Sequence, residues 1–146
     1  MGRTIFACIG GWIGWFLGGF DGFMYAMIVF VLCDYITGVI AAAVNGELSS
    51  EIGAKGIAKK VFEFILVGIA NVLDRQILKQ GAALRTLVIF FYVANEGLSI
   101  LENCTRIGLP VPEVLKKLLA QLKKKGNGDE DGDNESGNSN EQTSEE

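Results

Sequence analysis

The sequence predicts an all-α integral membrane protein with about four transmembrane helices, a C-terminal basic amphipathic helix and a disordered acidic tail. Three observations support this class. Hydrophobic residues make up 49% of the 146 residues. They fall into blocks, and a helix needs about 20 apolar residues to cross a bilayer. Short polar or glycine-rich segments separate the blocks, and the last of them leads into a strongly charged C-terminus.

Charge is distributed unevenly along the chain. The formal net charge is −4, but eight of the 17 acidic residues fall within residues 126–146, which contain no basic residue. The other nine acidic residues are outnumbered by 13 basic ones, so residues 1–125 carry a net charge of +4. A basic membrane part suits an anionic inner leaflet. The acidic tail argues against nucleic acid as a partner.

The residue types also argue against an enzyme. There is no histidine, the commonest general base and metal ligand. Cys8, Cys33 and Cys104 have neither metal-site spacing nor the even count of a disulfide framework. We therefore predict no catalytic residue, no cofactor and no metal.

The first predicted span covers residues 4–20 and should form a hairpin with the second through a turn at residues 18–22. In outline it resembles a signal peptide, but no small-x-small cleavage site follows it. Gly10, Gly14 and Gly18 recur every four residues, a tandem GxxxG pattern that lets helix backbones approach closely in lipid. The pattern leaves two alternatives open: packing within one protomer, or packing between protomers.

The second span, residues 23–44, carries one acidic residue, Asp34, near its middle. An ionised carboxylate at that depth costs roughly 2.5–3.5 kcal/mol on insertion scales, so it needs a partner, a proton or water. Gly38 and Ala42 follow at four-residue intervals and share one helix face with Asp34. We interpret this face as a helix–helix contact or as pore lining.

Residues 45–60 form a polar segment with Lys55, Lys59 and Lys60, which the positive-inside rule places in the cytoplasm. The third span is predicted at residues 61–78, with Glu63 at its interfacial end, close enough to meet Lys59 or Lys60. The external loop that follows runs against the charge rule. It contains or adjoins three basic residues: Arg75, Lys79 and Arg85.

The fourth span is predicted at residues 86–101 and contains Asn95 and Glu96. Glu96 lies 10 residues beyond Thr86, as Asp34 lies 11 beyond Phe23, which places both acids ~15–17 Å from the outer boundary. With Asn71 they would form a polar layer at mid-membrane, at a depth where no lysine or arginine is expected. The layer fits either a closed bundle joined by polar contacts or a hydrated lumen.

Residues 110–125 are predicted to form a basic amphipathic helix on the inner membrane surface. Its apolar residues recur at helical spacing after Pro110 and Pro112. The basic residues between them are Lys116, Lys117, Lys123 and Lys124. Residues 126–146 have no apolar periodicity and are predicted to be a disordered, solubilising tail.

Two segments, DYITGVIAAAVNGELSSEIGAKGIAKKV and RTLVIFFYVANEGLSILENCTRIGLPVPEVLKKLLAQL, resemble the toxin-secretion and phage-lysis holin family. The resemblance covers residues 23–122. The positions that match the family pattern are Asp34, Thr37, Gly38, Ser49, Ser50, Gly56, Lys59, Lys60, Asn95, Glu96, Gly97, Glu102 and Asn103. We predict a transmembrane holin domain over residues 1–109, which includes the first helix although that helix lies outside the matching segments. The resemblance implies a homo-oligomer that permeabilises the bacterial cytoplasmic membrane so that an endolysin, or a large toxin, can cross.

From the residues alone, two other functions remain open, a small proton-coupled transporter and a membrane anchor or assembly factor. The sequence shows no inverted repeat of the transporter kind. We therefore expect a multi-pass protein with a cytoplasmic C-terminus, whose physical partners are the lipid bilayer and further copies of itself.

Overall fold

A computed structural model describes residues 2–79 and 81–127, and within these ranges it is helical with no strand. The helices are α1 (Gly2–Phe16), α2 (Gly22–Val44), α3 (Ser50–Leu73), a short π-helical turn η1 (Asp74–Leu78), α4 (Ala83–Arg106) and α5 (Glu113–Asn127). The predicted all-α class is confirmed. Apart from Gly126 and Asn127, the predicted acidic tail lies outside the described residues.

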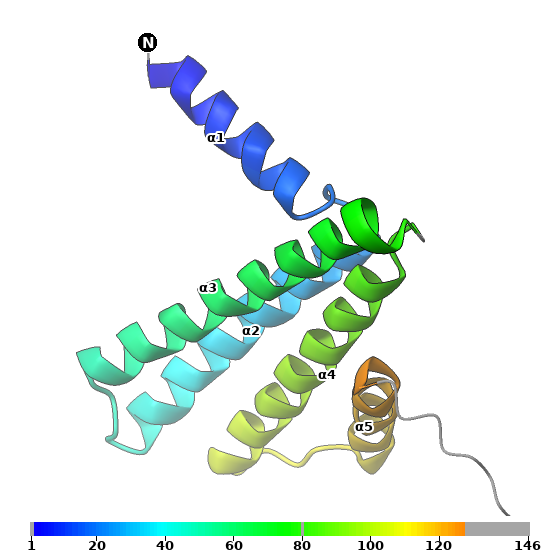
Figure 1. Ribbon diagram of the computed structural model, residues 1–146. Helices are drawn as coiled ribbons and strands as arrows, with labels where there is room; N and C mark the ends of the chain where they lie inside the picture. The colour runs from blue at the N-terminus through cyan, green and yellow to red at the C-terminus, as the bar shows by residue number, and fades with distance from the viewer. Residues whose placement is uncertain (1, 80, 128–146) are drawn as a thin grey trace, which may run out of the picture.

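Helix α4 is the centre of the arrangement, because it packs against α2, α3 and α5. The apolar core lies where α2, α3 and α4 meet, with Met24, Met27, Val67 and Ile89 almost completely buried. Helix α1 extends away from one end of this bundle (Figure 1) and has no buried residue. It contacts α3, where the Phe16 ring lies on Gly68, and does not pack against α2, so the expected hairpin of the first two helices is not formed.

Side-chain caps explain where two of the helices begin. The Asp21 carboxylate accepts a hydrogen bond from the Met24 amide at 2.9 Å and starts α2. The Ser49 hydroxyl accepts one from the Ile52 amide at 3.2 Å and starts α3. Both are N-caps, which satisfy amides that have no partner within the helix. The Ser49 cap makes residues 50–60 helical, so α3 begins 11 residues before the expected start of the third span at Val61.

Two of the described helices, α2 and α4, are long and apolar enough to cross a membrane. Helix α2 agrees closely with the predicted second span, whereas α4 extends beyond the predicted 86–101 at both ends. Helix α1 has 15 residues, fewer than a perpendicular span usually needs. The first half of α3 carries charged residues. Spans at residues 4–20 and 61–78 therefore stay predictions.

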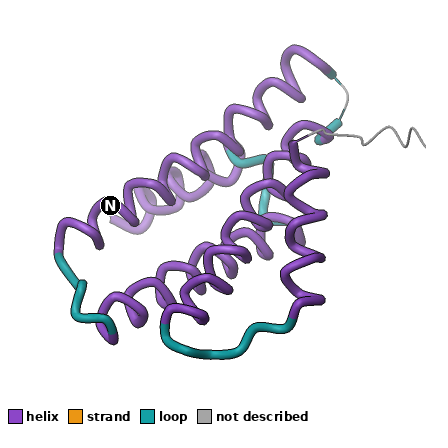
Figure 2. The backbone as a smooth tube through the Cα atoms, turned by 90° about the horizontal axis from the view of Figure 1, so that it is seen from below, coloured by secondary structure: helices purple, strands orange, loops and turns teal. Residues whose placement is uncertain are grey.

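Helix α5 follows a loop at residues 107–112 and packs back along α4. Figure 2 shows this connection among the teal loops. Its amphipathic character is as predicted, but part of its apolar side makes contacts within the protomer: Leu119 is 5% exposed and lies against Gly97, whereas Val114 and Leu118 are exposed. Hydropathy alone does not indicate this contact, because an apolar helix face is compatible equally with lipid and with another helix.

The turn after α1 approaches the bundle most closely at Gly18, and substitutions there test this approach. Its φ is +83°, and a Cβ atom there would overlap Asn71 Oδ1 and lie 2.6 Å from Arg85 Nε. Gly18→Ala should cost ~1–2 kcal/mol for the left-handed backbone, with roughly 1–3 kcal/mol more for overlap. Gly19→Ala is the matched control, because Gly19 has a φ of +95° but open space around it. Unfolding in detergent should rank the parent above Gly19→Ala and Gly19→Ala above Gly18→Ala, and equal losses would contradict the close approach.

Candidate functional site

A buried ion cluster joins the three bundle helices. Lys60 on α3 places its ammonium 2.7 Å from Asp34 Oδ2 on α2 and also hydrogen-bonds Glu96 Oε2 on α4. Glu96 is only 1% exposed, and Asp34 and Lys60 are both buried. Removing such ions from water costs several kcal/mol each, so their mutual attraction and hydrogen bonds must offset that cost. One lysine thus fixes the relative positions of α2, α3 and α4.

The cluster contains more acid than base. Glu63 lies one turn along α3 and is 3% exposed, with its Oε1 3.8 Å from Lys60 Nζ. Among the described residues, neither oxygen of Glu63 has a hydrogen-bond partner. Three carboxyl groups therefore surround one ammonium group, and full ionisation would leave a net charge of −2. A buried excess of this kind needs protons, water or further cations.

A second layer of polar groups orients Asp34. The Asn103 side-chain amide on α4 donates to Asp34 Oδ1 at 3.3 Å and to Thr37 Oγ1 at 3.2 Å. The Thr37 hydroxyl in turn donates to the Asp34 carbonyl at 3.1 Å. We call Asp34, Thr37, Lys60, Glu63, Glu96 and Asn103 the Lys60 cluster. Its members come from α2, α3 and α4, so it exists only in the folded protomer.

Clefts border the Lys60 cluster on two sides. One, of about 250 Å³, is lined by Asp34, Gly38, Ala42, Lys60 and Asn103 among others. The expected strip of small residues below Asp34 therefore lines a cleft inside the protomer. The other cleft, of about 390 Å³, is lined by Lys59, Glu63, Asn95, Glu96 and Lys123 among others. Water entering either cleft would reach the cluster directly.

A different polar group closes the opposite end of the bundle. Arg85 is 1% exposed, and its guanidinium donates to the Leu17 carbonyl at 2.6 Å, the Gly19 carbonyl at 3.0 Å and Asp21 Oδ2 at 2.6 Å. Asp74 accepts from the amides of Leu84 and Arg85 at 3.1 and 2.7 Å. We call this group the Arg85 clamp. Its donors and acceptors are well matched, unlike those of the Lys60 cluster.

Three expectations about polar residues do not hold. Lys60 is at the level of the two acids, where no base was expected, because α3 begins early and its lysine side chain reaches inward. Asn71 is not in that layer: it lies 11 residues farther along α3, ~16 Å away, and donates to the carbonyls of Trp15 and Phe16 at 3.3 and 3.0 Å. Glu63 is buried rather than interfacial.

The glycine stripe is shorter than the sequence suggested. Helix α1 ends at Phe16, so Gly18 lies in the following turn and does not share the helix face of Gly10 and Gly14. A Cβ atom on Gly14 would lie 3.3 Å from the Phe20 ring, whereas one on Gly10 would meet no atom within 4 Å. Only the Gly10 end of the stripe is open within the protomer.

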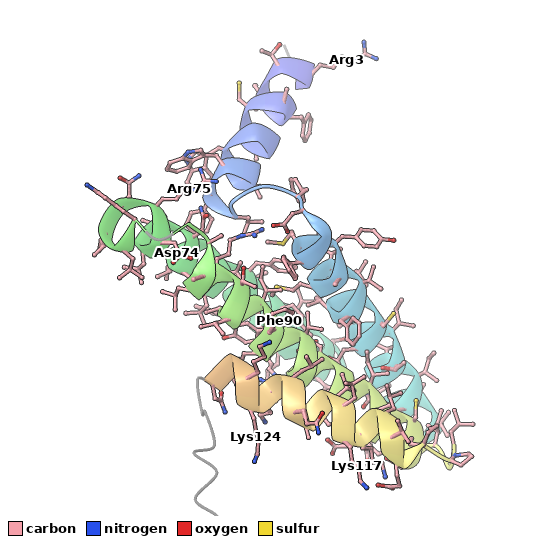
Figure 3. The ribbon with its side chains drawn as sticks, turned by 90° about the vertical axis from the view of Figure 1, so that its right-hand side faces the viewer. Arg3, Asp74, Arg75, Phe90, Lys117 and Lys124 are labelled. Atoms are coloured by element: carbon pink, nitrogen blue, oxygen red, sulfur yellow. The ribbon has the colours of Figure 1, made fainter. Side chains whose placement is uncertain are left out.

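The basic residues predicted for the membrane surface differ in their surroundings. Lys55 and Lys59 are exposed on the first half of α3, while Lys60 is withdrawn into the cluster. On α5, Lys117 and Lys124 are exposed, and Figure 3 shows both pointing away from the bundle. Lys123 is partly covered and faces the cleft that contains Glu63 and Glu96.

Residues 11–124 match the bacteriophage holin family. The chain belongs to the bacteriophage holin family. This match covers most of the protein, including the Lys60 cluster and α5. Members of the holin family are membrane proteins that are generally non-enzymatic, and no catalytic family is indicated.

Named relatives support the same assignment. An uncharacterized protein of Listeria monocytogenes is 47% identical over 118 residues, which are 81% of this chain and 84% of that protein. An uncharacterized protein of Clostridium perfringens is 45% identical over 77% of this chain and 84% of its own length. A probable holin of Bacillus phage phi105 is 38% identical over 71% of this chain and 74% of its own length. No solved structure matches.

Most of the Lys60 cluster falls on positions where the sequence resembles holins. Asp34, Thr37, Lys60, Glu96 and Asn103 were all among the matching positions, but the sequence did not show that they form one group. Glu63 was expected to meet Lys59 or Lys60, and it does lie near Lys60, which is three residues earlier on the same helix face. Its burial with Asp34 and Glu96 was not expected.

The Arg85 clamp predicts a defined pH dependence. The hydrogen bond from Arg85 lowers the pKa of the Asp21 carboxyl below its usual value of 3.8. The contribution of Asp21 to stability is therefore complete above about 3.8 and is lost as the pH falls through the lowered pKa. Asp21→Asn should be less stable than the parent at neutral pH, since it keeps the helix cap but loses the charge. The difference should disappear at acid pH.

Thermal unfolding in detergent across this pH range measures the difference. Glu47→Gln is the control, because Glu47 pairs with Arg106 at 2.6 Å on the exposed surface, where ion pairs contribute little. A deficit of Asp21→Asn that persists at the lowest pH would show that the Asp21 charge is not responsible.

Proposed function

We propose that this protein acts as a holin, oligomerising in the bacterial cytoplasmic membrane and forming pores through which an endolysin or a large toxin crosses. The observation that supports this most directly is the Lys60 cluster. It places three carboxyl groups and one ammonium group between helices that include α2 and α4, both apolar enough to cross a bilayer. The acid in excess of Lys60 is not needed to hold the helices together, and it gives the bundle a site that water can open.

The excess of acid explains how a closed protomer can open. In the closed protomer the attraction of Lys60 holds the carboxyl groups of the cluster together. When water enters the adjoining clefts, it weakens this attraction and solvates the excess acidic groups separately. Separation of the three helices then becomes more favourable as hydration increases, so opening is self-reinforcing once it has begun.

The proposed topology has four spans, with the N-terminus, the 45–60 segment and the start of α5 on the cytoplasmic side. The exposed lysines at the start of α3 and the Glu47–Arg106 pair lie at the same end of the bundle as the start of α5, which suits the inner surface. In the sequence, Arg85 was an exception to the positive-inside rule, but in the structure it is buried and paired with Asp21. Arg75 and Lys79 then remain as the two basic residues that the proposed topology places in the external loop against this rule.

Assembly through α1 is supported by its exposed apolar surface. Phe6 and Trp12 are 78% and 62% exposed, and Gly10 has open space beside it. A second copy of α1 can approach such a face closely in lipid.

Replacing Gly10 should separate assembly from folding. Gly10→Leu fills open space and leaves the protomer intact, so it should weaken crosslinked oligomers and delay permeabilisation. Cys8→Leu is the control, because Cys8 is also exposed but lies two residues from Gly10, on the opposite face of α1. If Gly10→Leu gives the crosslinking ladder of the parent, α1 does not mediate assembly.

Timed expression with and without an endolysin, followed by optical density, tests the function itself. The holin proposal predicts abrupt lysis only when both proteins are present. Flux of a solute without killing would instead favour a small transporter, and absence of both would favour an assembly factor.

Substitution of Asp34 tests the cluster in the same assay. Asp34→Asn keeps the shape beside Asn103 but removes one of the excess acids, whereas Asp34→Leu also removes the acceptor of the Asn103 hydrogen bond. Both proteins should accumulate in the membrane at parental levels, and lysis time should shift in both, more for leucine. Lysis on the parental schedule by membrane-inserted Asp34→Leu would show that the cluster is incidental to pore formation.

A further inference from the structure

Helix α5 is held tightly along α4. Leu119 fits against Gly97, where a Cβ atom would approach the leucine methyl groups to 2.8 Å. Farther along, Gly126 lies directly on the backbone of Phe91, and a Cβ atom there would be 2.6 Å from Phe91 N. The ammonium of Lys125 lies 6.0 Å from the centre of the Phe90 ring. Since position 97 of α4 meets position 119 and position 91 meets position 126, the two helices are antiparallel.

This packing carries α5 deep along a helix that is apolar enough to span. Phe90 and Phe91 lie only four and five residues beyond Thr86, the expected outer start of the fourth span, which corresponds to ~6–8 Å. The contacts therefore place most of α5 between the two membrane boundaries of α4, not at the inner surface where its sequence predicted it.

The outer surface of docked α5 carries lysines beside exposed apolar residues such as Val114 and Leu118. Lys117 and Lys124 point away from α4 in Figure 3, and Lys116 pairs with Glu113 at 2.9 Å. Lipid tails do not accommodate such a face at this depth, but water does, because intramembrane charges face cavities or protein. Lys123 turns toward the cleft of Glu63 and Glu96 and supplies positive charge near the acid-rich cluster.

The side of the protomer made by α2 and α3 is apolar. Exposed residues follow α2 at intervals of three or four: Tyr25, Val29, Leu32, Ile36 and Ile40. The second half of α3 continues this surface with Phe62, Ile65, Leu66 and Ile69. The folded protomer thus has one side suited to lipid and another suited to water, which is the arrangement a pore-wall subunit requires.

We propose that α5 remains docked on α4 within the membrane in the assembled pore and forms its water-facing wall, with its lysines lining the lumen. This inference rests on the proposed pore-forming function and adds which surface faces the lumen and with which charge. A lumen lined by α5 attracts anions, because the charged side chains of this helix are five lysines and one acid, Glu113. The α2 and α3 surface then faces the surrounding lipid.

Crosslinking of α5 to α4 in reconstituted membranes tests the position. Val88 and Asn127 line the same cleft, of about 430 Å³. Val88→Cys with Asn127→Cys, in a chain whose three native cysteines are replaced by alanine, should react with a short bismaleimide in liposomes. The crosslinked protein should still release an encapsulated dye. Val88→Cys with Glu113→Cys is the control that should not crosslink, because Glu113 is at the far end of α5.

Ion selectivity tests the lysine lining. In planar bilayers at about 10 mM salt, where the Debye length is roughly 30 Å, the parent should favour anions. Lys117→Glu with Lys124→Glu should shift the reversal potential toward cation preference. Lys55→Glu, on the exposed start of α3, should leave it unchanged.

The outcomes separate this inference from the function on which it rests. If the parent releases no dye, the pore-forming function fails and the lumen assignment fails with it. If the parent releases dye but the 88–127 crosslink does not form, α5 lies on the membrane surface and the lumen assignment alone is overturned. The lumen assignment is likewise overturned if the crosslink abolishes release or if the α5 charge reversal leaves selectivity unchanged.

Discussion

The contact of Lys60 with Asp34 and Glu96 is the interaction on which the bundle depends. It is the point where α2, α3 and α4 are joined by charge rather than by apolar packing. Because the cluster is buried, losing Lys60 would leave three carboxyl groups without a counter-charge in a medium that solvates them poorly. Apolar packing of Met27 and Val67 can hold the helices together, but it does not select one register so sharply.

The two ends of the bundle differ in how well their polar groups are satisfied. At the Arg85 clamp, one guanidinium meets two carbonyls and a carboxylate with good geometry, so this end is suited to staying closed. At the Lys60 cluster, acids exceed bases, Glu63 lacks a hydrogen-bond partner among the described residues, and clefts adjoin on two sides. Hydration should therefore begin at the Lys60 end, while the Arg85 end acts as the hinge.

The position of α5 adds to the difference between the two ends of the bundle. A helix that was amphipathic by sequence has two possible apolar neighbours, lipid and protein. The glycines at 97 and 126 allow the protein contact, since each lies where any side chain would separate the helices. Docking of α5 on α4 brings Lys123 to the cleft beside Glu63. The docked helix therefore covers one side of the Lys60 cluster and adds a positive charge near its acidic groups.

Hydropathy and helical spacing are local properties, so the sequence alone was enough to predict the helical class, the second span, the amphipathic fifth helix and most residues of the cluster. Counting residues from the span boundaries placed Asp34 and Glu96 at one depth, and they do meet at a shared lysine. The folded protomer was needed to show that Lys60 lies between them, that Asn71 serves another site and that α5 packs on α4. Those outcomes depend on where α3 begins and on close helix contacts, which join residues far apart in the chain and leave no periodic signal.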